Sequence, residues 1–212
     1  MPCHAMKTET TPASWQDGWL RQARAAPSPN FGPRPAGGPV DLIVLHSISL
    51  PPGRYGGPEI EQLFGNRLDW DSHPYFQCIR GLEVSSHFLI RRDGELVQFV
   101  SCDQRAWHAG RSSWRGRDNC NDDSIGIELE GLEGEPFEPA QYRTLSSLCQ
   151  ALAQRHPIAH IAGHEHVAPD RKQDPGAGFD WDRLRLSLGW PTERFPPGTA
   201  ATPASARNPH PD

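Results

Sequence analysis

The stretch GHEHVAPDRKQDPG, residues 163–176, places two histidines, several acidic side chains and a lysine in a segment that has no helical or strand periodicity. Asp174 follows His164 by ten residues. A further histidine, His46, comes near the end of the apolar run DLIVLHSIS (41–49), and open α/β sheets place their sites at strand ends of this kind. Together, His46, His164 and Asp174 would offer three nitrogen and oxygen ligands and leave a fourth position open. That is the layout of a catalytic zinc site rather than a structural one.

Spacing alone leaves alternatives open. A single histidine on a buried strand, such as His46, can be a core residue that bonds to a backbone carbonyl. His166 forms an H-x-H pair with His164 and is a competing ligand. The zinc pattern H-E-x-x-H is excluded, because position 168 is alanine. His87 is either a group that supports the site or a core histidine.

The segment SIGIELEG (124–131) alternates as a strand, so Glu128 and Glu130 share one face of it. Two carboxylates on one face can form salt bridges at a solvated surface. Alternatively, one of them takes a proton from a water molecule that a metal activates. Lys172 is either a solvated loop residue or the cation that stabilises an oxyanion in acyl transfer.

The elements that must position these groups alternate in type. The run at 41–49 suits a strand covered on both faces. Residues 85–100 form two strand-like runs around Asp93-Gly94, a strong hairpin signal. Helices are expected in the segment GGPEIEQLF, over about 139–155 and within 179–190. This order predicts an α/β fold with a mixed central sheet flanked by helices.

Composition sets the domain boundaries. The chain has 212 residues, which suits one domain. We expect a flexible N-terminus (1–14), one folded domain (15–190) and a disordered tail (191–212) that is rich in Pro, Ala and Thr. The segment 27–39 is expected to be a loop, because proline fixes φ and removes a donor.

Charge and hydropathy exclude several classes of protein. The net charge is −5 with no basic patch, which argues against nucleic-acid binding. No apolar run reaches eighteen residues, so no membrane span is expected. The first fifteen residues lack the features of a secretory signal, and the five cysteines contain no C-x-x-C pair. Free thiols and a cytoplasmic location are expected.

Five segments together resemble a known family. In order and spacing, LHSISLPPGRYGGP, SSHFLIRRDGELVQFV, RAWHAG, CNDDSIGIELEG and GHEHVAPDRKQDPG are similar to the 1,6-anhydro-N-acetylmuramyl-L-alanine amidases of the AmpD type. These belong to the zinc amidase family shared with phage lysozyme amidases and peptidoglycan-recognition proteins. The resemblance covers about residues 17–188.

The resemblance implies a mixed sheet flanked by helices and one zinc ion per chain, held by His46, His164 and Asp174. It implies that Glu128, rather than Glu130, is the general base and that Lys172 is the oxyanion partner. It also makes His166 a poor candidate for a ligand. The sequence departs from the family's pattern at two positions, neither of which is a ligand or the proposed base. Ser47 stands where relatives tend to have Asn or His, and Gln173 stands where Thr is common.

The implied reaction is hydrolysis of the amide between the lactyl group of N-acetylmuramic acid and L-alanine, on anhydro-muropeptides returning to the cytoplasm for recycling. Weaker candidates for substrate contact are Trp107, His108, Arg117, Asn119 and Asn121. We expect a monomer with a small muropeptide substrate. Two other functions are a non-catalytic peptidoglycan-recognition module, against which the complete ligand set argues, and a lytic amidase acting on intact cell wall, for which no export signal or lipobox is visible.

Overall fold

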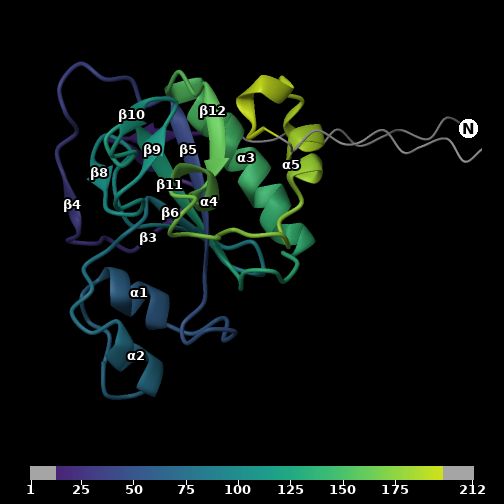
Figure 1. The fold of residues 1–212 in the computed structure, drawn as a ribbon. Coiled ribbons are helices and arrows are strands. Elements are labelled where there is room, and N and C mark those ends of the chain that lie inside the picture. The colour runs from purple at the N-terminus through teal and green to yellow at the C-terminus, as the bar shows by residue number, and fades with distance from the viewer. Residues whose placement is uncertain (1–12, 198–212) are drawn as a thin grey trace, which may run out of the picture.

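A six-stranded sheet forms the centre of the computed structural model, which describes residues 13–197 (Figure 1). In spatial order the strands are β12 (His160–Gly163), β5 (Leu42–Ile48), β11 (Ser124–Glu130), β6 (Phe88–Ile90), β7 (Leu96–Gln98) and β3 (Arg24–Ala25). The first four are parallel, whereas β7 runs antiparallel to β6. The sheet is therefore mixed, as the alternation of elements predicts.

The two faces of the sheet bury alternate residues of the same strands. One face packs against α3 (Pro139–Arg155) and α5 (Trp181–Leu188), which lie side by side in Figure 1. The residues that β5 and β11 contribute to this core are Ile43, Leu45, Ile125, Ile127 and Leu129. On the other face, Leu42 and Val44 pack with Ala109, Trp114 and Val167. Strand β5 is thus covered on both sides, which confirms the interpretation of its continuous apolar run.

Shorter helices and two-residue strands complete the fold. Helix α4 (His164–Val167) begins directly after β12, while α1 (Glu59–Phe64) and α2 (Pro74–Cys78) project below the sheet in Figure 1. The remaining short strands are β1 (Trp15–Gln16), β2 (Trp19–Leu20), β4 (Phe31–Gly32), β8 (Arg105–Ala106), β9 (Ser113–Trp114) and β10 (Arg117–Asp118). The predicted loop 27–39 therefore contains one two-residue strand, β4, which pairs with β8.

The predicted hairpin and long helix are both present. Strands β6 and β7 pair antiparallel around the Asp93-Gly94 turn, and α3 covers residues 139–155. The cysteines within the described residues are free thiols. In the same part of the chain, none of the helices combines the length and apolarity that a membrane span needs.

The predicted start of the C-terminal tail is wrong. A 3₁₀ turn, η1 (Thr192–Arg194), follows α5, and Phe195 is 3% exposed in the core formed with α3 and α5. One apolar side chain in a proline-rich segment is enough to bring residues 191–197 onto the domain. The rest of the predicted tail (198–212) and most of the predicted flexible N-terminus (1–12) lie outside the described residues.

Candidate active site

Three neighbouring parallel strands place His164, His46 and Glu128 in one row. In the sheet register, Glu128 of β11 lies beside His46 of β5, and Gly163 at the end of β12 lies beside Leu45. His164 is the next residue after Gly163, so it is level with His46. Because equivalent positions of adjacent strands point to the same face, the two imidazoles and the carboxylate share one side of the sheet.

Asp174 reaches this row from the loop that follows α4. The backbone N–H of Glu165 donates to the carbonyl of Asp174 at 2.9 Å, and Arg171 donates to the carbonyls of Ala109 and Arg111 at 2.7 and 2.9 Å. These bonds hold the loop against the start of α4 and against residues 109–111. The loop therefore returns its carboxylate to the histidines without any regular secondary structure.

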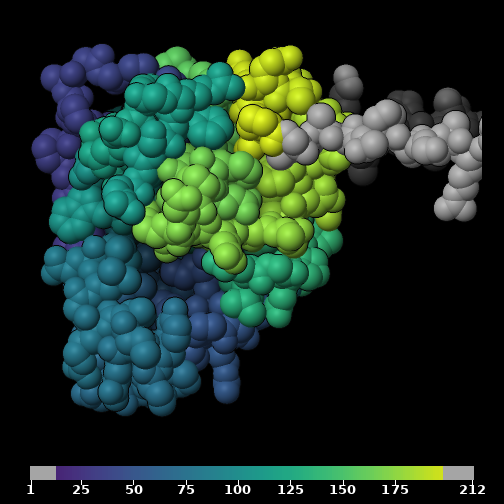
Figure 2. Space-filling view, viewed as in Figure 1, coloured from purple at the N-terminus to yellow at the C-terminus, as the bar shows by residue number. Residues whose placement is uncertain are grey.

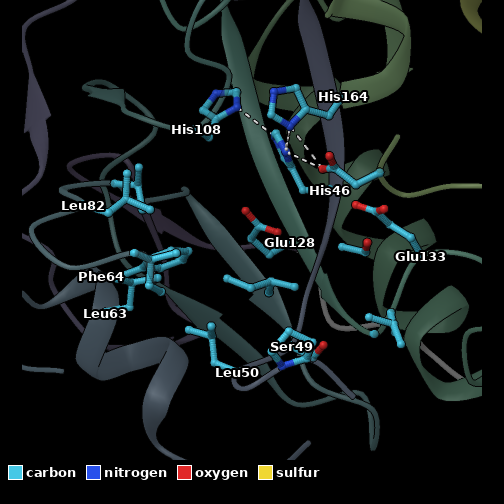
Figure 3. A pocket seen from close by; sticks show the side chains of 18 of the residues that line it. His46, Ser49, Leu50, Leu63, Phe64, Leu82, His108, Glu128, Glu133 and His164 are labelled. Carbon is cyan, nitrogen blue, oxygen red and sulfur yellow. Dashed lines mark hydrogen bonds and ion pairs between the residues drawn. The ribbon is translucent and has the colours of Figure 1, made fainter. Parts of the chain in front are cut away.

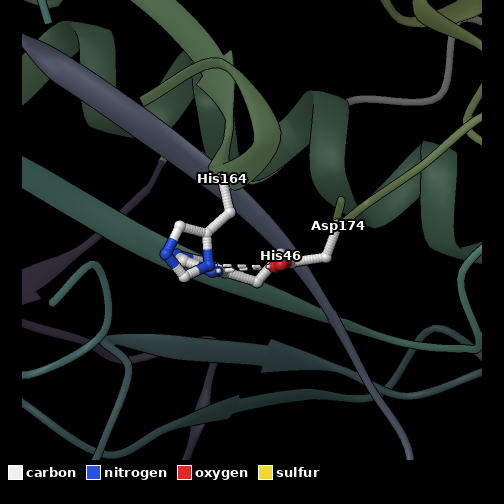
Figure 4. Close-up of side chains that lie close together, drawn as sticks. All are labelled: His46, His164 and Asp174. Atoms are coloured by element: carbon white, nitrogen blue, oxygen red, sulfur yellow. Dashed lines mark hydrogen bonds and ion pairs between the residues drawn. The ribbon is translucent and has the colours of Figure 1, made fainter. Parts of the chain in front are cut away.

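Three ligand atoms converge at this point (Figure 4). The Nδ1 atoms of His46 and His164 are 3.0 Å apart, and they lie 3.2 and 3.1 Å from Oδ2 of Asp174. All three residues are buried, at 2%, 3% and 5% exposure. Sequence spacing left this set open, and the fold brings it together.

The tautomer of His164 fits a metal ion bound by His46, His164 and Asp174. Nε2 of His164 lies 3.1 Å from the carbonyl of Ala109, which can only accept, so the ring hydrogen is on Nε2. In the neutral ring, Nδ1 then presents a lone pair to His46 and to the Asp174 carboxylate. A histidine that donates its far nitrogen to a carbonyl is a common arrangement at metal sites. The donor set of two nitrogens and one carboxylate oxygen suits a four-coordinate ion with one open position.

The charges of the group agree with this fit. Burial, with a smaller effect of His164, lowers the pKa of His46 to about 4, so the ring is neutral near pH 7. Burial alone would raise the pKa of Asp174, but the adjoining imidazoles of His164 and His46 outweigh it and keep that pKa well below its usual value. Neutral imidazoles and an ionised carboxylate are the forms that bind metals.

A cavity of about 410 Å³ opens beside the three residues, and Glu128 and Lys172 both line it. Figure 3 shows Glu128 projecting into this space below His46. Glu128 is 8% exposed, and burial, reinforced by the charge of Asp174 and opposed by Lys172, raises its pKa well above the usual value. A carboxyl group with a raised pKa is suited to accept and return a proton near neutral pH.

The opposite wall of the cavity is apolar and was not predicted from the sequence. Its residues come from α1, α2 and the segment after them: Leu63, Phe64, Tyr75, Ile79, Leu82 and Val84. In Figure 2 the molecule is hollowed between the green residues of α4 and its following loop and the blue residues of α1 and α2. The periodicity of α1 predicted a buried face, but nothing local showed that part of it would line a cavity.

The competing candidates lie elsewhere. His166 accepts from the backbone N–H of Gly163 through Nδ1 at 3.0 Å and packs edge-on against Trp181. Glu130 accepts from Arg91 at 2.8 Å and from the backbone N–H of Gly56 at 2.7 Å. Glu130 is therefore occupied in anchoring a loop.

Four of the five weaker candidates do not line the cavity, so the structure does not support the predicted substrate contacts for them. Arg117 pairs with Asp41 and Asp123, which precede β5 and β11 at the opposite end of the sheet. Asn121 is buried, and its Oδ1 accepts from the backbone N–H groups of His108 and Ala109. Asn119 accepts from Arg105 at 3.1 Å. The remaining one, Trp107, is half-buried and bonds through its backbone to Ser85.

His108 lies in the cavity wall, but behind a candidate ligand. Its Nδ1 is 2.9 Å from Nε2 of His46, as the dashed line in Figure 3 shows. His87 is fully buried deeper in the fold, where its Nδ1 accepts from the backbone N–H of Gly126 and its Nε2 lies 3.0 Å from the carbonyl of Gln104. Of the two positions that depart from the family's pattern, Ser47 lines the cavity, whereas Gln173 is exposed.

Comparisons with known proteins identify the family of the chain. Residues 36–177 match the family model described as N-acetylmuramoyl-L-alanine amidase. A relative from Citrobacter freundii, the 1,6-anhydro-N-acetylmuramyl-L-alanine amidase AmpD, is 52% identical over 80% of this chain and 91% of its own length. A crystal structure of an AmpD derivative superposes with a TM-score of 0.79 at 52% identity, covering 82% of this chain and 98% of that one.

A more distant structure is the amidase AmiD from E. coli in complex with the substrate anhydro-N-acetylmuramic acid-L-Ala-D-gamma-Glu-L-Lys. It is 31% identical, has a TM-score of 0.52, and the match covers 72% of this chain and 59% of that one. With a family model that spans most of the domain and a curated relative at half identity, the chain belongs to the N-acetylmuramoyl-L-alanine amidase family.

Proposed function

We propose that this enzyme is a zinc amidase that hydrolyses the amide between the lactyl group of 1,6-anhydro-N-acetylmuramic acid and L-alanine of muropeptides. The observation that carries the proposal is the buried group of His46, His164 and Asp174, which opens on a cavity containing one carboxyl group of raised pKa. We assign these three residues as the zinc ligands. When bound, zinc supplies a Lewis acid for the amide carbonyl and makes water more acidic.

The remaining chemistry belongs to Glu128 and Lys172. Glu128 takes a proton from the attacking water and passes it to the leaving amine of alanine, and its raised pKa makes the carboxylate a stronger base for the first transfer. Lys172 contributes a positive charge to the same cavity, where it stabilises the oxyanion that develops during attack. The apolar wall formed by α1 and α2 gives the sugar and peptide a surface to pack against.

The substrate class follows from the relatives. The name of the Citrobacter relative specifies the 1,6-anhydro sugar, and the AmiD complex holds an anhydro-muropeptide. We therefore propose cytoplasmic recycling of muropeptides as the setting. Mass spectrometry of products from an anhydro-muropeptide and from intact sacculi tests this: rapid release of the peptide from the anhydro-muropeptide alone is expected. Equal or faster cleavage of sacculi would favour the lytic amidase, and tight binding without cleavage would favour a recognition module.

The zinc assignment predicts about one zinc ion per purified chain and loss of activity on strong chelation, with recovery when zinc is returned. His46→Ala, His164→Ala and Asp174→Ala should each weaken zinc binding, measured by competition with a chromophoric chelator. His166→Ala is the matched control, because its ring faces Gly163 and Trp181. If His166→Ala loses zinc and His164→Ala keeps it, the ligand assignment is wrong.

The role of Glu128 is tested by Glu128→Gln, with Glu133→Gln as the control. Both residues line the cavity, but Glu133 is exposed. Loss of a general base typically lowers the rate by about 10²–10⁴-fold. We expect Glu128→Gln to show this loss while it keeps its zinc content, and Glu133→Gln to stay close to wild type. Equal and mild effects in the two variants would remove Glu128 from the mechanism.

A further inference from the structure

A chain of hydrogen bonds leads from His46 away from the cavity and ends on a backbone carbonyl. Nε2 of His46 meets Nδ1 of His108 at 2.9 Å, and Nε2 of His108 meets the hydroxyl of Ser124 at 3.1 Å. That hydroxyl donates to the carbonyl of Cys120. All three side chains are buried.

The carbonyl at the far end fixes every hydrogen in this chain. A carbonyl only accepts, so the hydroxyl hydrogen of Ser124 points to Cys120, and its oxygen is left to accept from Nε2–H of His108. Among the described residues, the ring nitrogens of His108 bond only to His46 and Ser124, and neither is an anion. Burial therefore favours the neutral ring, which leaves Nδ1 as an acceptor.

The consequence reaches the metal site. Because Nδ1 of His108 accepts, His46 must donate through Nε2, and the remaining nitrogen of His46, Nδ1, carries a lone pair. That atom is the one that faces His164 and Asp174. His164 reaches the same state through the carbonyl of Ala109. His164 is thus oriented directly by a backbone carbonyl. His46 is oriented through two side chains, those of His108 and Ser124.

We propose that His108 and Ser124 are positioning residues that fix His46 as the Nδ1-metal-binding tautomer, and that Gly126 provides the slot in which His108 lies. A Cβ atom at Gly126 would lie 2.5 Å from Cγ of His108, closer than real contacts allow. Ser124, Gly126 and Glu128 alternate along one face of β11. This face therefore carries the hydroxyl that orients His108, the gap that admits its ring and the proposed general base.

The proposal that His108 and Ser124 orient a metal ligand rests on the proposed zinc site. The tautomers of His46 and His108 can nevertheless be measured without zinc. Two-dimensional NMR of the full chain with ¹⁵N-labelled histidine reports which ring nitrogen carries hydrogen. In metal-free wild type we expect hydrogen on Nε2 of both His46 and His108, and zinc should leave this pattern unchanged. Hydrogen on Nδ1 of His108 would overturn the proposal, whatever the zinc experiments show.

Zinc affinity of variants supplies the second readout, measured by chelator competition rather than by activity. Loss of a partner that orients a metal-binding histidine typically weakens metal binding by about 10–100-fold. We expect that loss for Ser124→Ala and Gly126→Ala. Ser112→Ala is the control, since Ser112 is also buried and bonds through its hydroxyl to the Cys120 N–H and the Gly110 carbonyl, outside the chain to His46. Equal zinc affinities of Ser124→Ala and Ser112→Ala would refute the positioning role.

Discussion

Acid should destabilise this protein well above the pH at which most carboxylates titrate, and His87 is a main cause. This side chain is fully buried, and both ring nitrogens are already used, Nδ1 by the N–H of Gly126 and Nε2 by the carbonyl of Gln104. A second ring hydrogen would point Nδ1–H at the N–H of Gly126. Burial, together with the nearby charge of Arg34, lowers the pKa of His87 to about 3.

The sign and size of the effect follow from this pKa. At pH 7, His87 is neutral in the folded chain and mostly neutral in the unfolded chain. As the pH falls below about 6.5, the unfolded chain binds a proton that the folded chain does not, so the free energy of unfolding falls until the folded pKa is reached. At pH 5, about 1.5 units below the unfolded pKa, the loss from His87 alone is about 2 kcal/mol.

The assay is urea unfolding at pH 7 and pH 5, followed by tryptophan fluorescence, for wild type and His87→Asn. Asparagine can keep the acceptor for Gly126 but does not titrate in this range. The variant should be less stable at pH 7, yet its loss between pH 7 and pH 5 should be about 2 kcal/mol smaller than that of wild type. Other buried histidines and any bound metal affect both proteins alike and cancel in the difference. Equal losses in the two proteins would show that His87 is not held neutral by the fold.

Two further predictions concern parts of the chain outside the cavity. Phe195→Ala should lower the free energy of unfolding by about 3 kcal/mol, because a large buried side chain is removed from the core with α3 and α5; thermal unfolding that is unchanged would show that this segment does not pack. Glu130→Gln should cost about 2 kcal/mol, because Arg91, which is 7% exposed, would lose one of its two carboxylate partners and keep Glu61. The zinc affinity of Phe195→Ala and of Glu130→Gln should stay near that of wild type. Weaker zinc binding by Glu130→Gln without a loss of stability would contradict the structural role of Glu130.

The elements of the sheet and α3 could be predicted because their signals are local. The apolar run at 41–49, the Asp93-Gly94 turn and the 3.6-residue period over 139–155 each lie within one segment, and the structure confirms them. Phe195 could not be predicted in this way. The composition of residues 191–212 describes the average of a segment, whereas one phenylalanine decides where the domain ends.

The site was predictable only in part, because its members meet through sheet register. His46 and His164 are 118 residues apart in the chain, and their proximity depends on β12 pairing with β5. Arg117 shows the opposite case. A polar loop near catalytic motifs suggested a substrate contact, yet its partners Asp41 and Asp123 become neighbours only when β5 and β11 pair. Spacing along the chain carries no information about either arrangement.

His108 marks the limit of what residue types can show. The sequence identified it as a candidate, but its role depends on the direction in which each hydrogen bond donates, and that direction is set by the carbonyl of Cys120. The same face of β11 that holds its slot and its hydroxyl partner also holds Glu128, while Ile125 and Ile127 on the other face belong to the core with α3. Because side chains alternate along β11, one face of this strand packs in the core and the other face carries the residues of the proposed site. This explains why a histidine in the segment RAWHAG, far from the ligands in sequence, lies directly behind one of them in the fold.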